Sequence, residues 1–342
     1  MRSGLDLTHI DKNVRPQDDL FRFMNGKWLT ESKIPDDRAS DGAFYWLYEQ
    51  AEKQVKQIIL DQAQLKAAVG SNAQKIGDLY NSFMDEEFIQ AQGLSPIAAD
   101  LKAAQSFKSL DEFLTLLGEL EARGLSGLFY TYVSTDNKDS TKNIVYLGQS
   151  GLSLPDEAYY REDEYQEIRE SFLAHIQKMF ELAKLANPSQ SAQEVLLIET
   201  KIASFHWDQV KDRDAELTYN KMDFDQLSKL APSFNWPLWI EKSQTPAHVL
   251  SQVIIRQPSY LEGLGKLLTE FDLGPWRSWM SWHVLSGASP YLSTEFVNEN
   301  FNFYGTTLSG IPKLKDRWKR AVGLVEGALG EAVGQIYVQR HF

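Results

Sequence analysis

The 342-residue chain contains no cysteine. This absence excludes a disulfide framework, a thiolate zinc site and a cysteine nucleophile. No stretch approaches the run of about eighteen apolar residues that a membrane-spanning helix needs. The N-terminal residues also lack the apolar segment of a secretory signal peptide. We therefore expect no membrane partner and a cytoplasmic location, although export without a signal peptide would leave no trace in the sequence.

Basic residues are fewer than acidic residues. The chain has 35 Lys and Arg residues against 47 Asp and Glu residues, which gives a formal net charge of −12. A surface with this excess repels phosphate backbones, so nucleic acid is not an expected partner. Apolar residues make up 43% of the chain and charged residues 24%, as is usual for a globular protein. The length fits about two domains, or one large domain with an appendage.

Motifs that would carry chemistry are absent as well. The zinc-peptidase pattern His-Glu-x-x-His does not occur. No two histidines lie three or four residues apart, the spacing at which one helix presents two imidazoles to a metal. The histidines are His9, His175, His206, His248, His283 and His341. We predict no catalytic residue and no metal ligand in this chain, and a site assembled from distant histidines remains the alternative.

Two repeated patterns each allow a structural and a functional interpretation. Trp276, Trp279 and Trp282 recur at every third position, which drifts around a helix and favours core packing over a ligand-stacking platform. Four glycines near the end of the chain have the spacing of a membrane-helix dimer. Charged residues lie among them, so we favour a soluble helix that packs closely on its neighbours. These glycines are Gly323, Gly327, Gly330 and Gly334.

Hydrophobic periodicity predicts a mainly α fold. From Gly42 onward, apolar residues recur at helical spacing, among them Phe44, Leu47, Val55 and Ile58. A capping box at 109–112 opens another helix. Further helices are expected at about 165–185, 190–210, 222–231, 246–269, 272–288, 290–303 and 313–342. One small β-hairpin is predicted at about 128–134 and 143–149, with the polar run 135–142 as its turn.

The two ends of the chain differ from this pattern. Residues 1–41 lack periodicity and contain Pro16, Gly26 and Pro35, so we expect an irregular N-terminal arm. The arm is dense in large apolar residues, which predicts that it docks on another surface. At the other end, the last predicted helix runs to Phe342 without a glycine stop or a polar tail. This predicts a sequence that is interrupted there.

Several ordered segments resemble the neprilysin and endothelin-converting-enzyme family of zinc metallopeptidases. The segment 18–29 reads DDLFRFMNGKWL and is followed by Ile34-Pro35, and a Gly-x-Phe pattern at 42–44 begins the first long helix. The segment 151–160 reads GLSLPDEAYY, and AVGQIYV follows at 332–338. The matches run in register along nearly the whole chain, and they are most similar to bacterial members without a membrane anchor.

The resemblance implies a helical lid domain over residues 42–342, truncated at its C-terminal end. It also implies roughly as many residues again beyond Phe342, which would carry the zinc ligands and the catalytic glutamate. Zinc would then be the cofactor of the full-length enzyme, bound by none of the residues here. The implied partners are this missing C-terminal catalytic half and short peptide substrates. The 342-residue chain alone is expected to be inactive.

The resemblance further implies two groups of functional residues. In neprilysin, an arginine two positions before Gly-x-Phe grips the substrate carboxylate and an aspartate after the Phe assists. Here Ser40 and Tyr45 occupy those positions, and Arg38 lies two residues before Ser40. Serine cannot form a bidentate charged contact, so the substitution favours endopeptidase over carboxydipeptidase activity. In the arm, we expect Phe21, Phe23 and Trp28 to anchor the interface with the catalytic domain.

The sequence therefore favours the N-terminal, substrate-gating portion of a zinc-dependent endopeptidase. Two alternatives remain. The first is a naturally truncated relative that binds peptides or another protein without catalysis. The second is a helical scaffold that shares only the fold, which should not expose a large apolar face.

Overall fold

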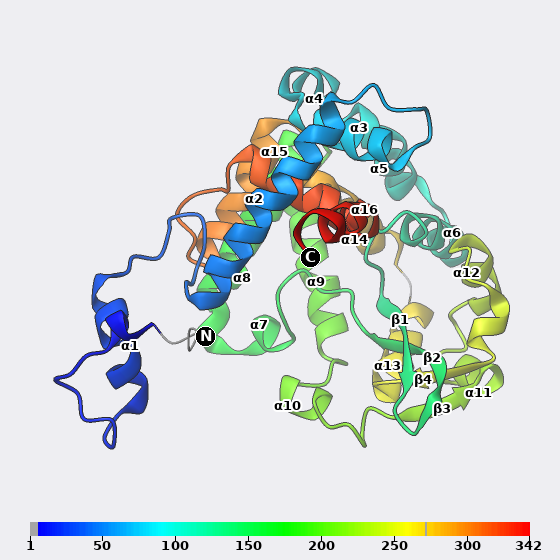
Figure 1. Cartoon of the computed structure of the whole chain (residues 1–342). Coiled ribbons are helices and arrows are strands. Elements are labelled where there is room, and N and C mark those ends of the chain that lie inside the picture. Colours follow the sequence, from blue (N-terminus) through cyan, green and yellow to red (C-terminus); the bar gives the residue numbers. More distant parts are fainter. Residues whose placement is uncertain (1–5, 271) are drawn as a thin grey trace. The chain divides into compact units, whose positions relative to one another are not determined.

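α-Helices dominate the computed structural model, which describes residues 6–270 and 272–342 (Figure 1). The prediction of a mainly α fold is confirmed. The chain forms two units: the first contains the described residues up to Met84 together with Ser309–Phe342, and the second contains Asp85–Leu308. None of the described helices is long and apolar enough to cross a membrane.

The first unit has a core of three helices: α2 (Ala43–Gln64), α3 (Asn72–Met84) and α16 (Arg317–His341). Its buried residues come from all three helices, among them Ile58 and Ile59 from α2, Ile76 from α3 and Val325 from α16. Helices α2 and α3 approach closely at Gly77, where an added Cβ would lie 2.8 Å from the Cα of Ala63. The predicted periodicity thus reflects burial in α3 and in the second half of α2.

The glycines of α16 do not have the predicted role. A Cβ built at Gly323, Gly327, Gly330 or Gly334 would meet no other described atom within 4 Å. These positions lie away from the side of α16 that buries Val322, Val325 and Val333. The expectation of a close helix–helix approach was therefore wrong, because glycine spacing cannot tell which face of a helix is covered.

The arm is not irregular throughout. It contains the helix α1 (Leu20–Glu31), whose first turn is capped by Asp19: its Oδ1 accepts a hydrogen bond of 2.8 Å from the Arg22 N–H. The expectation of an arm without regular structure was thus wrong for this segment. The helix has a narrow apolar pattern interrupted by Gly26, which hid its period. Docking of the arm on another surface stays a prediction.

The helix α14 (Leu273–Ala288) is the buried central helix of the second unit. Trp276, Trp279 and Trp282 are all buried, as the preference for core packing predicted. They pack against Phe113 from α6 (Leu110–Glu121) and Phe172 from α8 (Gln166–Leu182). A helix with buried residues on every side has no single apolar stripe.

The other helices of this unit are α4 (Glu86–Gln92), α5 (Ala98–Ser106), α7 (Ala158–Arg161), α9 (Pro188–Ala203), α10 (Gln209–Asp212), α11 (Phe224–Leu230), α12 (Trp236–Lys242), α13 (Pro258–Thr269) and α15 (Thr294–Asn300). A π-helix (Phe301–Thr307) follows α15.

The small sheet has four strands in the order β1-β2-β4-β3. They are β1 (Phe129–Asp136), β2 (Asp139–Gln149), β3 (Asn220–Asp223) and β4 (Gln252–Ile255). β1 and β2 are antiparallel, β2 and β4 are parallel, and β3 is antiparallel to β4. β4 lies inside the segment 246–269 that was predicted to be helical, so that prediction was wrong there. A short buried apolar run has the same pattern in a helix and in a strand.

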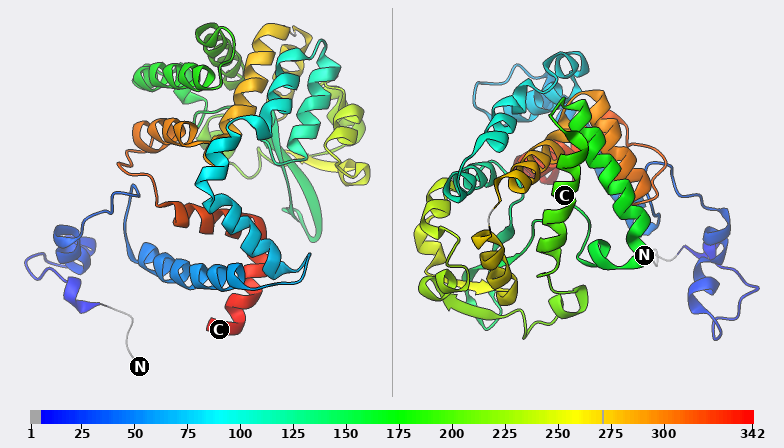
Figure 2. Two further views of the ribbon diagram at one scale, coloured as in Figure 1. Left: turned by 90° about the horizontal axis from the view of Figure 1, so that it is seen from above. Right: turned by 180° about the vertical axis from the view of Figure 1, so that it is seen from behind.

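The predicted hairpin is present but longer. β1 ends at Asp136 and β2 begins at Asp139, so most of the expected long turn is strand. Figure 2 (left) shows the hairpin projecting from the helices of its unit. Apart from Asp136, its outer half is mainly exposed on both faces, so its sequence lacks the alternation of apolar and polar residues that is typical of a strand.

The tip of the hairpin is held by Asp136, which is almost fully buried. Its carboxylate accepts hydrogen bonds from the Lys221 ammonium (2.9 Å), the Tyr219 hydroxyl (2.8 Å) and the Lys138 N–H (2.9 Å). The hydrogen bond from Lys221 is the largest cause that holds the pKa of Asp136 well below its usual range. These contacts connect the β1–β2 turn to β3.

We expect this carboxylate to make the hairpin sensitive to acid. Because the folded-state pKa is lowered, the stabilisation is present above the unfolded pKa near about 4 and is lost as the pH falls through the folded value. The protection factors of the β1 and β2 amides, which compare observed with intrinsic exchange at each pH, should therefore fall on acidification more in the wild type than in Asp136→Asn. Equal pH dependence in both proteins would contradict this role.

Candidate functional site

The three residues proposed to bind substrate lie together at the start of α2. The Ser40 hydroxyl donates a hydrogen bond of 2.9 Å to the Tyr45 hydroxyl oxygen. The Arg38 guanidinium lies over the Tyr45 ring, 5.0 Å from its centroid. The segment before α2 is fixed to the rest of its unit by Asp37, whose carboxylate accepts a hydrogen bond of 2.6 Å from Lys319. The geometry thus brings the three residues into contact at the start of α2.

The charge of Arg38 is largely neutralised within the chain. Its Nη2 donates to Glu49 at 2.7 Å, and its Nη1 lies 3.6 Å from Asp41. The Arg38 side chain is only 13% exposed. A peptide carboxylate would have to compete with both acidic groups. The site is therefore poorly suited to grip a free C-terminus.

The residues that follow form an apolar surface on α2. Phe44 is 87% exposed and Trp46 is 62% exposed, and Tyr45, Leu47 and Tyr48 are exposed beside them. The apolar stripe predicted from the sequence is thus buried only in the second half of α2, at Val55 and Ile58. Exposed apolar patches of this kind mark interaction surfaces.

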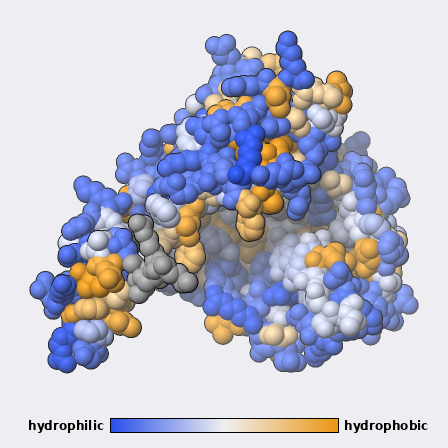
Figure 3. All heavy atoms as spheres, viewed as in Figure 1, coloured by the Kyte–Doolittle hydropathy of each residue, from blue (hydrophilic) through white to orange (hydrophobic). Residues whose placement is uncertain are grey.

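Apolar side chains also gather on α1 (Figure 3). Phe21 is 62% exposed, whereas Phe23 and Trp28 are partly buried within their own unit. The Phe23 carbonyl accepts a hydrogen bond of 2.9 Å from the Asp11 N–H. The expected interface anchors thus do not form one exposed set. Of the three residues, Phe21 has the largest exposed fraction and is the one most available to contact another surface.

A metal site does not fit the side chains that are present. Across residues 6–270 and 272–342, no group of three or more histidine, aspartate or glutamate residues is placed to hold a metal ion. The histidines make separate contacts: His175 with Glu299 at 2.8 Å, and His206 with the Ser150 carbonyl at 3.0 Å. Burial lowers the pKa of His206 to about 4, so this imidazole is neutral at neutral pH.

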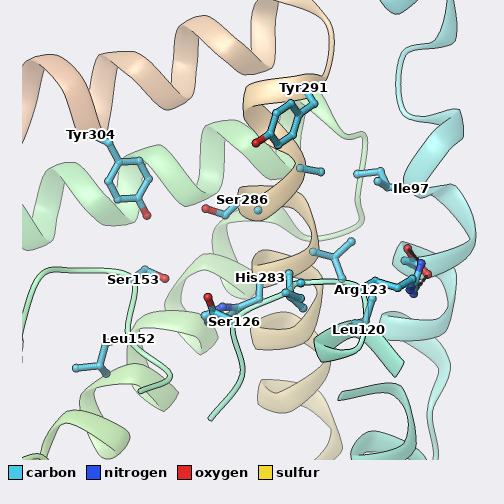
Figure 4. Close-up of a pocket in the computed structure, with 16 residues that line it drawn as sticks. Ile97, Leu120, Arg123, Ser126, Leu152, Ser153, His283, Ser286, Tyr291 and Tyr304 are labelled. Carbon is cyan, nitrogen blue, oxygen red and sulfur yellow. Dashed lines mark hydrogen bonds and ion pairs between the residues drawn. The ribbon is translucent and has the colours of Figure 1, made fainter. Parts of the chain in front are cut away.

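A cavity of about 590 Å³ opens in the second unit beside α14. Figure 4 shows the Tyr304 ring directed towards Ser153 and Ser286, with His283 on the wall formed by α14. Behind this wall, the fully buried Glu199 accepts hydrogen bonds from the Ser153 hydroxyl (2.6 Å) and the Tyr160 hydroxyl (2.6 Å). His283 Nε2 lies 3.2 Å from the same carboxylate.

This network fixes the wall of the cavity. The Trp282 indole N–H donates to the Ser153 hydroxyl oxygen at 2.8 Å, which joins the aromatic core to the polar groups. Burial, and then the nearby charge of Glu199, raise the pKa of Tyr160 well above its ordinary value. Tyr160 is therefore a hydrogen-bond donor, not an ionisable group, at neutral pH. The network thus holds the Ser153 hydroxyl and the His283 ring in fixed positions at the wall of the cavity.

Sequence reasoning named none of these residues as a site. The one available signal was the segment 151–160, which contains Ser153 and Tyr160. Glu199 and His283 come from α9 and α14, far away in sequence, and carry no local motif. Their proximity is a result of helix packing alone.

Comparison with known proteins gives consistent matches over nearly the whole chain. A family model described as "Peptidase family M13" matches residues 16–342. Human endothelin-converting enzyme 1 is 27% identical over 355 residues, which covers 98% of this chain and 45% of that protein. The zinc metalloprotease ZMP1 of Mycobacterium tuberculosis, solved with an inhibitor, is similar with a TM-score of 0.96 at 43% identity.

That match covers 99% of this chain and 52% of ZMP1. PepO of Lactobacillus rhamnosis shares the fold, with a TM-score of 0.81 at 22% identity over 96% of this chain and 52% of that one. The chain thus spans about half the length of these relatives.

Proposed function

The chain belongs to peptidase family M13, and from this we propose that it is the N-terminal, substrate-gating (lid) part of a zinc-dependent endopeptidase that acts on short peptides. The family match over residues 16–342 carries the proposal. It confirms the resemblance to the neprilysin and endothelin-converting-enzyme family. The relatives named above include one zinc metalloprotease, ZMP1, and each relative is about twice as long as the region that this chain matches.

Under this proposal the catalytic chemistry resides outside the present residues. A catalytic zinc site needs three protein ligands and one open position for water. The described part of the chain does not provide such a set. We therefore assign the zinc ligands and the catalytic residues to a C-terminal half of the polypeptide. Zinc, when bound there, would polarise the peptide carbonyl and activate water.

The role of the present residues would be to select and position the peptide. Arg38, Ser40 and Tyr45 form a polar group next to the exposed aromatic side chains Phe44 and Trp46. A neutralised arginine with two hydroxyls favours contact with peptide backbone over capture of a terminal carboxylate. This supports endopeptidase activity. The exposed face on α2 also counts against a scaffold complete in itself.

The first test is complementation. We expect the purified chain alone to contain no stoichiometric zinc and to leave a short internally quenched peptide uncleaved. Mixing it with the C-terminal half of ZMP1, the part outside the match, should restore cleavage. Phe21→Ser should weaken assembly of the halves by roughly thirtyfold, the effect of losing an interface hot spot. Lys66→Ser, at a distant exposed position, should leave assembly unchanged.

The outcomes separate the alternatives. Stoichiometric zinc and cleavage by the chain alone would overturn the assignment of chemistry to the other half. Peptide binding by the chain, without cleavage in any mixture, would favour the non-catalytic, peptide-binding relative.

A further inference from the structure

A second cavity, of about 340 Å³, lies in the second unit at the start of β1. Its wall includes the first residues of β1, the last residue of α6 and the residues that follow α12. It combines one carboxylate, several hydroxyls and aromatic rings. The residues that matter for its chemistry are Glu121, Phe129, Thr131, Trp239, Ser243 and Thr245.

Glu121 is the unusual member of this wall. Its Oε2 accepts a hydrogen bond from the Trp239 indole N–H. Its Oε1 is buried and has no hydrogen-bond partner among the described residues. The carboxylate rests against the backbone at Gly127, where an added Cβ would lie 1.5 Å from Oε1. Only glycine at this position leaves room for the carboxylate.

Among the described residues, the cations next to Glu121 in sequence and at the end of α12 are paired with other carboxylates, so none compensates its buried carboxylate. Lys242, at the end of α12, pairs with Glu241 at 3.0 Å, and Arg123 pairs with Asp100 at 2.8 Å. Glu121 also ends α6, and a helix C-terminus carries partial negative charge. Burial raises the pKa of Glu121 to about 7. A cation in the cavity would relieve each of these unfavourable conditions.

Next to the cavity, β1 offers an unpaired strand edge. The Arg256 N–H donates to the Leu147 carbonyl at 2.9 Å, so the backbone of Leu147 faces β4. Since backbone direction alternates along a strand, Tyr146 and Gly148 face β1 and bond to their register partners Tyr132 and Tyr130.

Thr131, between these partners, and Val133, which follows Tyr132, therefore turn their N–H and C=O groups outward. No described strand lies on that side of β1. An unpaired edge of this kind can accept an extended peptide as an added strand.

We propose that this cavity binds the protonated amino terminus of a short extended peptide, whose following residues pair with the free edge of β1. The ammonium group has three donors. The Glu121 carboxylate and the hydroxyl oxygens of Thr131, Ser243 and Thr245 are acceptors in the same wall. The rings of Phe129 and Trp239 add cation–π attraction. From the cavity, the peptide would run parallel to β1, past Val133.

This inference goes beyond the proposed function and does not depend on it. The site lies wholly within the unit Asp85–Leu308 and needs no catalytic half. Failure to bind the peptide would leave the complementation result untouched, and failure of complementation would leave this binding untouched.

The test is calorimetric titration of the whole chain with two tetrapeptides, Ala-Val-Thr-Val amide with a free amino terminus and its N-acetylated form. We expect the free amine to bind about tenfold or more tightly, the effect of a charge-assisted hydrogen bond. Near neutral pH its binding should release protons, because burial raises the pKa of Glu121 to about 7 and the bound ammonium favours the ionised carboxylate. Equal affinity for the two peptides, or no binding of the free amine at about millimolar concentration, would overturn the proposal.

Two variants test whether the Glu121 carboxylate provides the affinity for the free amine. Glu121→Gln keeps an acceptor for Trp239 and should reduce the affinity for the free amine to that of the acetylated peptide, without proton release. Glu119→Gln removes the same charge from an exposed position of α6 and should change neither. An unchanged affinity in Glu121→Gln would overturn the assignment of the carboxylate.

The strand edge has its own variant. Val133→Pro removes an outward-facing N–H and leaves the β1–β2 bonds intact, as proline is tolerated at strand edges. It should weaken both peptides equally. If it weakens neither, pairing with β1 is excluded.

Discussion

Glu199→Ala is expected to lower the free energy of unfolding by about 3–5 kcal/mol, because it removes the shared acceptor of several buried hydrogen-bond donors. The Glu199 side chain is fully buried and accepts hydrogen bonds from Ser153 and Tyr160, with His283 beside it. Alanine would leave several buried donors without an acceptor, and each such donor costs about 1–3 kcal/mol. Natural domains have only about 5–15 kcal/mol of stability in total.

The measurement is urea denaturation followed by circular dichroism. Glu181→Ala, at an exposed position of α8, is the matched control and should change stability by less than about 0.5 kcal/mol. Tyr160→Phe should cost less than Glu199→Ala, and the double variant should show strong non-additivity because the two side chains share one hydrogen bond. Equal effects of Glu199→Ala and Glu181→Ala would exclude a structural role for the buried network.

Trp279→Ala should have a similar effect by a different mechanism. Trp279 is fully buried, its ring packs 5.6 Å from Trp276 and 4.0 Å from His283, and its indole N–H donates to the Gly151 carbonyl at 3.3 Å. Removing a buried indole leaves a cavity and lost contacts worth about 3–5 kcal/mol. Trp279→Phe should lose less, because a ring still fills part of the space.

The matched control is Trp46→Ala, which makes the same substitution at an exposed position of α2. Its free energy of unfolding should stay within about 0.5 kcal/mol of the wild type, although it removes apolar surface from the proposed substrate face. The unfolding midpoints of Trp279→Ala and Trp46→Ala should therefore differ widely. If they coincide, the burial of α14 does not control the stability of its unit.

Much of the helical architecture could be predicted from local patterns. The periodicity of Val55 and Ile58 located α2, and the capping residue Ser109 located the start of α6. Predictions from local patterns were wrong where the burial of side chains did not match the pattern of apolar residues in the sequence. β4 has a continuous apolar run with no period, and the outer half of the hairpin is mainly exposed on both faces. α1 is interrupted by Gly26, which hid its helical pattern.

The same distinction holds for the site. Arg38, Ser40 and Tyr45 lie within eight positions of one another, so a motif could point to all three at once. The motif could not show that Glu49 and Asp41 neutralise Arg38, because that depends on side-chain orientation around the start of α2. The interface anchors show the same limit. The sequence identified Phe21, Phe23 and Trp28 as a group, whereas the structure leaves mainly Phe21 exposed.

By itself, the sequence determined the helical class and the family, because hydrophobic period and ordered short motifs are properties of neighbouring residues. Only the tertiary structure decided which charges and hydroxyls meet. Glu199 gains its partners from segments about forty to eighty residues away, and Glu121 is left without a cation by the positions of Arg123 and Lys242. Electrostatic and hydrogen-bond energies depend on distances of a few ångströms and on burial. Neither quantity is set until the chain has folded.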